Sequence, residues 1–314
     1  MGSLVISIDA ELGWGFHDLA DPPESRVESG RRGWRRLLAL LDRFDVPATW
    51  AVVSHLMLDR CDGRHADHPA PPGWFERERG AWADRPDLRF APDLVAGILA
   101  ADPDHELAAH SFSHVLFGDP ETTPEIAREE YERSREIAAR WGLVVDSFVY
   151  PRNDVGHLDV LADCGFRAYR GRSPTPEGIR GVADAAIRDR SSLVHPRIDE
   201  FGLVSIPASL FAFGFEGRLR SIAESVWTDP IVARARRGID RAATDDGVFH
   251  LWLHPNNLRA TRDDDRMAAI LEYAAEVRAE SALEIETMGE VADRVGPSRT
   301  GDRNEATTRA ERVI

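Results

Sequence analysis

Two acidic side chains, Asp9 and Glu11, follow an apolar, β-branched stretch near the start of the chain. This stretch, residues 3–8, predicts a strand, and residues two apart on a strand face the same side. Both carboxylates can therefore line one cavity at the carboxyl end of a parallel sheet, where such folds place their active sites. There they could act as a general base or bind a metal ion. Two incidental acids on a solvated loop are the alternative.

Two histidines, His110 and His114, follow a second strand-like stretch at residues 105–109. Their four-residue spacing predicts both imidazoles on one face of a helical turn, and pairs so spaced chelate divalent metals. Isolated histidines more often pack or cap, but two at this spacing directly after a buried strand favour a metal site. His105 is expected at the opposite end of that strand and has no assigned role.

Two further strand ends carry groups that could take part in chemistry. Arg152, in the segment YPRN, could pair with a carboxylate and lower its pKa, although it is one of 39 arginines and could be an ordinary surface residue. His254 ends a predicted strand at the same rim, where an imidazole can donate a proton to a leaving amine. His250, inside that strand, is expected to be structural.

The elements that must position these residues alternate between short β-branched runs and longer amphipathic segments. This alternation is typical of βα units, and it favours a distorted (β/α) barrel of mostly parallel strands over a doubly wound sheet. The predicted strands cover residues 3–8, 47–53, 105–109, 145–150, 166–169, 202–206, 248–253 and 283–287, and the predicted helices cover residues 30–44, 92–101, 123–141 and 263–280.

One catalytic domain is expected over residues 1–295. Within it, residues 59–88 contain many Pro, Gly, Asp and Arg residues without a clear period, which predicts a long loop insertion. Residues 296–314 are polar and low in bulky side chains, which predicts a disordered tail.

The composition limits the possible partners. The net charge is −15 and the chain contains no lysine, a pattern that resembles salt-adapted proteins. A GC-rich genome would explain the missing lysine but not the acidic excess. Without a basic stripe, nucleic acid is not an expected partner. No apolar run approaches the ~20 residues of a membrane helix, and no signal-peptide pattern is present, so a cytoplasmic location is expected. The two cysteines predict ordinary thiols.

Four motifs then occur in an order that resembles a known family. IDAE at residues 8–11, HSFSH at 110–114, YPRN at 150–153 and LWLH at 251–254 resemble the polysaccharide deacetylases, also called the NodB homology domain or carbohydrate esterase family 4. PATWAVVSHL at residues 47–56 resembles the second strand of that family. The resemblance covers roughly residues 3–290 and implies a (β/α) barrel of the NodB type.

The resemblance also implies roles for individual residues. Asp9 would be the base, Arg152 would hold it in place, and His254 would protonate the departing amine. Ala10 stands where most members have a second aspartate, so the chain resembles branches with a DxE motif, in which Glu11 would bind the metal. The implied ion is zinc, with cobalt, manganese or nickel as alternatives. The implied site comprises the catalytic residues Asp9, His254 and Arg152, the metal ligands Glu11, His110 and His114, and Trp14, Tyr150 and Asn153 at the substrate.

The activity implied is removal of N-acetyl groups from a saccharide or glycan precursor by hydrolysis of the amide C–N bond. Trp14 and a tryptophan of the 59–88 loop could stack on the sugar, and a backbone N–H near Tyr150 could stabilise the oxyanion. Two alternatives stay open. One is a metal-dependent C–N hydrolase of a small cyclic amide or ureide, and the other is a non-catalytic glycan-binding protein that binds no metal. The oligomeric state is left open.

Overall fold

Strand β1 (Ser3–Ala10) lies at the centre of the fold. Along one edge it pairs in parallel with β9 (Val248–Leu253), and along the other with β10 (Glu284–Glu286) near its start and β2 (Thr49–Val52) near its end. All residues of β1 and β9 are buried, as expected for parallel strands covered on both faces. Because β1 is central, the residues at its carboxyl end lie in the middle of the molecule.

The computed structural model describes residues 2–172, 193–213 and 229–297. Within them, ten strands form one sheet in the order β6-β7-β5-β4-β3-β2-β1-β9-β8, with β10 pairing beside β1. Every pairing is parallel except that of β6 with β7. The remaining strands are β3 (Glu106–Ala109), β4 (Ser147–Val149), β5 (Ala168–Arg170), β6 (Arg197–Ile198), β7 (Val204–Ser205) and β8 (Leu210–Phe211).

The two ends of this sheet are joined by one short segment of chain. β7 pairs with β5 near one end of the strand order. β8 begins five residues after β7 ends, yet it pairs with β9 at the other end of the strand order. Residues 204–211 therefore curl the sheet into a distorted barrel, and the carboxyl ends of β1, β3, β4, β5 and β9 meet at one rim. The predicted fold class, a distorted (β/α) barrel with mostly parallel strands, is confirmed.

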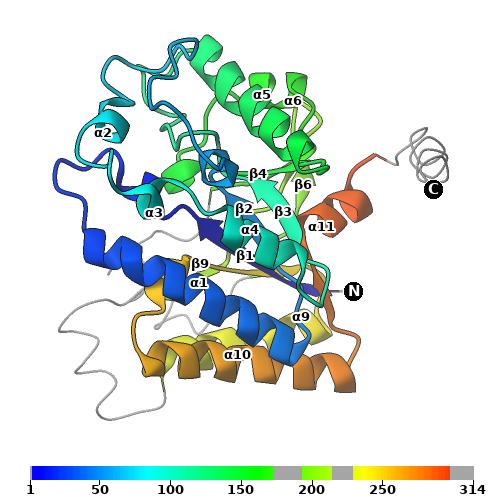
Figure 1. Ribbon diagram of the computed structural model, residues 1–314. Coiled ribbons are helices and arrows are strands. Elements are labelled where there is room, and N and C mark those ends of the chain that lie inside the picture. Colours follow the sequence, from blue (N-terminus) through cyan, green and yellow to red (C-terminus); the bar gives the residue numbers. More distant parts are fainter. Residues whose placement is uncertain (1, 173–192, 214–228, 298–314) are drawn as a thin grey trace, which may run out of the picture.

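Helices cover the outside of the sheet on two sides (Figure 1). The first side carries α1, α9 and α10, and the opposite side carries α5 and α6. The helices are α1 (Glu24–Phe44), α2 (Glu76–Arg79), α3 (Pro86–Arg89), α4 (Pro92–Leu99), α5 (Pro124–Arg140), α6 (Leu158–Asp163), α9 (Pro230–Thr244), α10 (Thr261–Glu280) and α11 (Met288–Val295), with short 3-10 turns η1 (Trp14–Phe16), η2 (Ser54–Met57), η3 (Pro151–Asn153) and η4 (Pro255–Asn257).

Helix α1 shows how the sequence sets these contacts. Its buried residues include Val27, Trp34, Leu37 and Leu41, which recur at helical spacing and face the core. The helix ends where Asp45 adopts a left-handed conformation, with φ of 52°.

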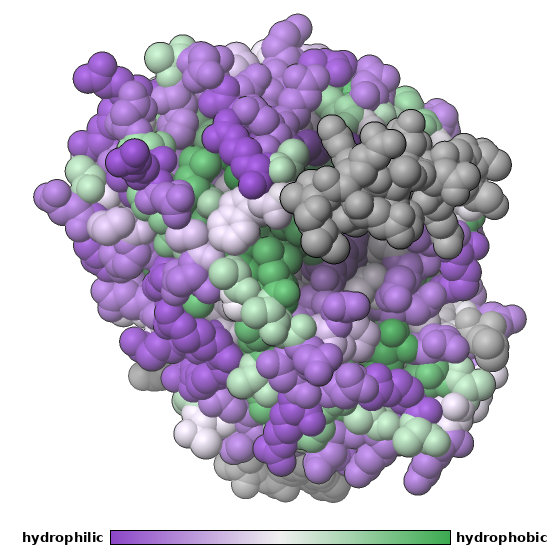
Figure 2. All heavy atoms as spheres, turned by 45° about the vertical axis from the view of Figure 1, so that its right-hand side comes forward, coloured by the Kyte–Doolittle hydropathy of each residue, from purple (hydrophilic) through white to green (hydrophobic). Residues whose placement is uncertain are grey.

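Among the described residues, no helix combines the length and apolar character needed to cross a bilayer. The face in Figure 2 is mostly hydrophilic, with a band of hydrophobic residues across its middle.

All eight predicted strands are present, each within two residues of its predicted ends. β6 and β8 were not predicted because two residues are too few to show a period, and α9 was missed although its buried positions also recur at helical spacing. Residues 59–88 have little regular structure apart from α2 and most of α3. Most of the predicted tail, residues 298–314, lies outside the described residues.

Candidate metal centre and catalytic groups

Glu11, His110 and His114 lie together at the carboxyl rim of the barrel. All three are buried, and one ligand atom from each lies within 4.8 Å of the others. Nε2 of His114 is 3.1 Å from Oε2 of Glu11. Burial raises the pKa of Glu11, but the charge of His254 and the hydrogen bond and charge of His114 outweigh it and hold that pKa well below its usual range. Burial lowers the pKa of His114. A carboxylate and a neutral imidazole are the forms that bind metals.

The hydrogen bonding of His110 fits a cation at this place. Its Nδ1 lies 2.7 Å from the backbone oxygen of Val149. A carbonyl oxygen can only accept, so Nδ1 carries the hydrogen and, in the neutral ring, Nε2 carries a lone pair. That Nε2 is buried, makes no hydrogen bond within the described residues, and lies 3.6 Å from Oε2 of Glu11. A lone pair facing a carboxylate is unfavourable unless a cation lies between them, so these residues fit a divalent metal.

The loop that carries both histidines differs from the predicted helical turn. Ser111 and His114 have left-handed backbones, with φ of 62° and 66°, so residues 110–114 form an irregular loop. The Ser111 hydroxyl accepts the backbone N–H of His114 at 2.8 Å, and Glu130 of α5 accepts that of Ser113 at 2.8 Å. The imidazoles converge through this tightly bonded loop rather than through helical spacing, and their rings lie 5.1 Å apart.

The side chain of Glu11 passes so close to residue 15 that only glycine fits there. A Cβ at Gly15 would collide with Cγ and the carboxylate of Glu11. The glycine therefore gives the side chain of Glu11 the space in which it reaches the two imidazoles.

Asp9 is held by an arginine that was not predicted. Arg170, the last residue of β5, donates from Nη1 and Nη2 to the two oxygens of Asp9 at 2.6 and 2.7 Å. Both residues are buried, and the guanidinium also lies 4.6 Å from the centre of the Trp252 ring. Burial raises the pKa of Asp9, but the charge and hydrogen bonds of Arg170 more than offset this and lower it. Asp9 is therefore an oriented carboxylate at neutral pH.

The expectation that Arg152 holds Asp9 is wrong. Arg152 has a left-handed backbone (φ 52°) inside the turn η3, and this directs its side chain outward to Asp18, at 2.6 Å. The side chain is 41% exposed, as the surface alternative implied. Arg170 could have been found by the same rule that found the other groups, because it directly follows a predicted strand.

His254 lies beside both acidic residues. Its Nε2 is 3.8 Å from Oδ2 of Asp9 and 3.6 Å from Oε1 of Glu11, and its side chain is 20% exposed. The rings of Phe211 and Trp252 flank it at 5.8 and 5.4 Å. The groups predicted at three separate strand ends, the pair of Asp9 and Glu11, the histidine pair and His254, are thus brought together.

The residues expected at the substrate lie differently from the prediction. Trp14 is fully buried and donates from Nε1 to the backbone oxygen of Arg89, so it cannot stack on a sugar. The Tyr150 side chain is also fully buried, with its hydroxyl 3.1 Å from that of Tyr131, which leaves only its backbone for the site. Asn153 accepts from Nε and Nη2 of Arg170 at 3.1 and 2.8 Å, so it orients the arginine.

One tryptophan of the 59–88 loop remains suitable for stacking. Trp74 is partly exposed, and its Nε1 donates to Oγ of Ser113 at 3.0 Å, next to His114 in the chain. His17 packs against Trp74, with ring centres 5.0 Å apart, and burial lowers the pKa of His17 to about 4. Trp82, the other candidate in this loop, is 1% exposed and belongs to the core.

Comparisons with known proteins establish the fold. No protein-family model matches the sequence, and no curated protein matches it. A Mycobacterium smegmatis structure assigned as a polysaccharide deacetylase has a TM-score of 0.61 and 20% identity, over 96% of this chain and 94% of that one. A Pseudomonas aeruginosa PAO1 structure with the same assignment has a TM-score of 0.57 and 16% identity, over 92% of this chain and 89% of that one. The structure of Puue allantoinase also has a TM-score of 0.57 and 16% identity, over 92% of this chain and 88% of that one. These likenesses confirm the barrel type that the motifs predicted.

Proposed function

We propose that this protein is a metal-dependent hydrolase that removes N-acetyl groups from a saccharide or glycan precursor. The activity would reside in one domain, residues 1–295, with the 59–88 loop beside the site. Support comes from the fold, which solved structures assigned as polysaccharide deacetylases share, and from the convergence of a possible base, a possible acid and three possible ligands at one rim.

The observation that carries the proposal is the arrangement of Glu11 and His110. The Val149 carbonyl fixes the hydrogen of His110 on Nδ1, which leaves the buried Nε2 lone pair facing a carboxylate at 3.6 Å. A purely structural histidine would be expected to direct a donor at such a carboxylate. An acceptor in this place is the arrangement that metal-binding histidines adopt when a second partner fixes the tautomer.

The chain's own groups can carry out amide hydrolysis. A divalent ion held by Glu11, His110 and His114 would polarise the acetamide carbonyl and lower the pKa of a water molecule. Asp9, ionised and oriented by Arg170, takes a proton from the attacking water; a carboxylate has lone pairs left for this although both oxygens bind Arg170. The water oxygen bonds to the carbonyl carbon, the C–N bond breaks, and His254 gives a proton to the departing nitrogen. The products are acetate and a free amine.

Metal content and acetate release together test this proposal. The wild type and His110→Ala would be compared by elemental analysis and by acetate released from an N-acetylglucosamine oligomer, in molar salt because of the charge of −15. His110→Ala should lose metal and activity together. Asp9→Asn should keep its metal and lose turnover by a factor on the order of 10² or more, as for removal of a general base. Survival of both metal and rate in His110→Ala would overturn the assignment.

A second substrate class, the small cyclic amides and ureides, shares the support from the fold. The likeness to Puue allantoinase equals that to the Pseudomonas structure in TM-score and identity, so the fold does not separate the two classes. Parallel assays of acetate release from sugars and of ring opening of cyclic amides would distinguish them. Ring opening in the absence of acetate release would replace the deacetylase proposal while keeping the metal centre.

A further inference from the structure

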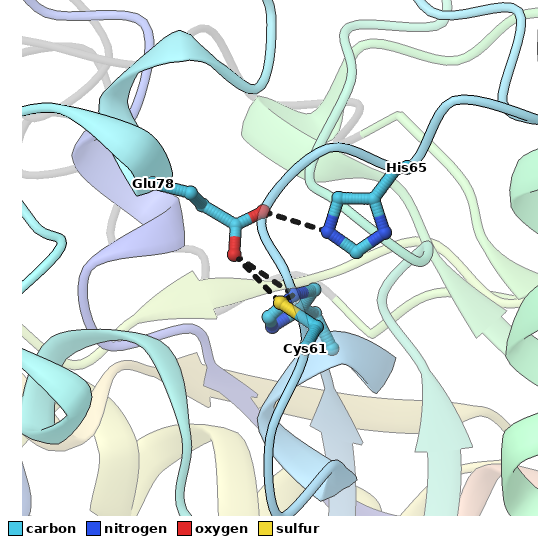
Figure 3. A group of neighbouring side chains, drawn as sticks. Cys61, His65 and Glu78 are labelled. Carbon is cyan, nitrogen blue, oxygen red and sulfur yellow. Dashed lines mark hydrogen bonds and ion pairs between the residues drawn. The ribbon is translucent and has the colours of Figure 1, made fainter.

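Four side chains with metal-binding atoms cluster at a second place, where the 59–88 loop leaves the barrel. His55 lies in η2, Cys61 and His65 follow in the loop, and Glu78 comes from α2. One ligand atom of each lies within 4.8 Å of the others. In Figure 3 the carboxylate of Glu78 lies between the imidazole of His65 and the sulfur of Cys61.

The distances within this cluster are short. Nε2 of His65 is 2.8 Å from Oε1 of Glu78, and Nε2 of His55 is 3.1 Å from Oε2. Sγ of Cys61 is 3.2 Å from Oε2 and 3.3 Å from Nε2 of His55. Zinc bond lengths of roughly 2.0–2.3 Å place neighbouring ligand atoms of a tetrahedron about 3.4 Å apart. These four separations lie within about 0.6 Å of that value, and all four ligand atoms lie within 4.8 Å of one another, so the cluster has the dimensions of a tetrahedral site.

The orientation of His55 points to a cation, as that of His110 does. Its Nδ1 lies 3.2 Å from the backbone oxygen of Arg89, which can only accept, so the hydrogen is on Nδ1. In the neutral ring, Nε2 then presents a lone pair to the thiol and the carboxylate. A histidine whose second nitrogen is fixed by a backbone carbonyl is the common arrangement at zinc.

Arg89 provides the competing explanation. It donates from Nε and Nη2 to Oε2 of Glu78 at 3.0 and 2.7 Å, and from Nη2 to Sγ of Cys61 at 3.1 Å. With the Cys61 thiol donating to Oε2 of Glu78 and Nε2 of His65 donating to Oε1, hydrogen bonds alone can also join these atoms. The two states differ in the form of the sulfur, which is a protonated thiol in the network and a thiolate on a metal.

We propose that His55, Cys61, His65 and Glu78 form a second divalent-metal site, separate from the Glu11 centre. One thiolate, two imidazoles and one carboxylate suit zinc. Four protein ligands complete a tetrahedron, so the site is structural, and Arg89 is its outer hydrogen-bond partner. The metal would fasten the long loop, which has little regular structure, and hold Trp74 near Ser113.

Metal stoichiometry tests the proposal, with the other cysteine as the control. Zinc-loaded wild type should contain two equivalents, Cys61→Ala one, and Cys164→Ala two. His110→Ala should lose only the equivalent of the other centre, so failure of the proposed function and failure of this site give different results. In the cobalt-substituted protein, the sulfur-to-metal charge-transfer absorption should vanish in Cys61→Ala and persist in His110→Ala. Equal metal content and equal spectra in wild type and Cys61→Ala would overturn the site.

A measurement on the wild-type chain covers the case in which Cys61→Ala does not fold. The protein is treated with a thiol-alkylating reagent with zinc or with a chelator, and the labelled peptides are quantified by mass spectrometry. Zinc should slow labelling of Cys61 at least tenfold and leave Cys164 unchanged. Equal labelling of Cys61 in both conditions would show that hydrogen bonds alone hold the cluster.

Discussion

Arg170 and Asp9 form a buried, two-point ion pair between the carboxyl ends of β5 and β1, with N···O distances of 2.6 and 2.7 Å. The pair is itself supported, since Arg170 also donates to Ser7 Oγ at 3.1 Å and to the side chain of Asn153. Such geometry fixes both the charge and the direction of the Asp9 carboxylate. The proposed base is therefore preorganised by the barrel before any substrate binds.

Replacement of Arg170 should disable the base without emptying the metal centre. In Arg170→Gln the carboxylate of Asp9 loses its partner, and we expect kcat to fall by a factor of about 10², with metal content unchanged and KM little affected. Breaking a buried pair also costs stability, about 3–5 kcal/mol, so Arg170→Lys serves as a milder variant. The matched control is Arg152→Gln, which removes an exposed pair with Asp18. A larger loss of kcat in Arg152→Gln than in Arg170→Gln would contradict this assignment.

The contrast between these two arginines shows what the sequence can and cannot predict. Strand ends were predictable because parallel strands covered on both faces are continuous apolar runs. The placement of Asp9, Glu11 and His254 at one rim followed from these strand ends. The direction of a side chain in a turn was not, since the φ of 52° at Arg152 depends on the tertiary structure around η3. Arg170 directly follows a predicted strand and could have been predicted on that ground, but it belongs to none of the four motifs.

The cluster of His55, Cys61, His65 and Glu78 could not be predicted from the spacing of these residues in the sequence. Cys61 and His65 are four residues apart, but Glu78 joins them only through the path of the loop and the position of α2. Irregular segments have no period from which their geometry can be predicted. The prediction of ordinary thiols rested on the small number of cysteines and the absence of a CxxC pair, and both Cys61 and Cys164 are free cysteines. Only the proposed site would give Cys61 a further role.

Substitution of Gly15 should weaken metal binding without touching a ligand. In Gly15→Ala the new Cβ collides with the carboxylate end of Glu11, and the side chain must move away from the two imidazoles. We expect metal affinity to fall about 10–100-fold, the size of effect seen when the support of a ligand is lost. Competition with a chelating indicator measures it. Gly97→Ala is the control, because a Cβ there makes an ordinary 3.5 Å contact with Leu38; equal affinities for both variants would refute the role of Gly15.

The two tryptophans of the 59–88 loop should respond differently to truncation. Trp74 is partly exposed and lies near the loop of residues 110–114, so Trp74→Ala should raise KM for an N-acetylglucosamine oligomer severalfold and leave kcat little changed. Trp82 is 1% exposed, so Trp82→Ala should instead lower the free energy of unfolding by about 3–5 kcal/mol. Steady-state kinetics and urea unfolding separate these outcomes. An unchanged KM in Trp74→Ala would remove Trp74 from the substrate site.

His250 should make the protein sensitive to acid. It is buried in β9, accepts from the Ser7 hydroxyl and donates to the backbone of Pro207. Burial, with the charge of Arg170, lowers its pKa from 6.5 to about 3. Between these values the unfolded chain takes up a proton that the folded protein does not. The contribution of His250 to stability is therefore complete above pH 6.5, and it is lost as the pH falls, by up to ~1.4 kcal/mol per pH unit.

Comparison of His250→Gln with the wild type isolates this contribution. Glutamine does not titrate, so the variant should be less stable at pH 7, but its free energy of unfolding should fall less steeply between pH 6.5 and pH 4.5, by about 1 kcal/mol per pH unit. Urea unfolding at several pH values gives both slopes, and the common effect of titrating carboxylates cancels in the difference. His195→Gln, at an exposed position, is the control and should keep the wild-type slope. A His250→Gln slope equal to that of the wild type would show that His250 is protonated in the folded protein.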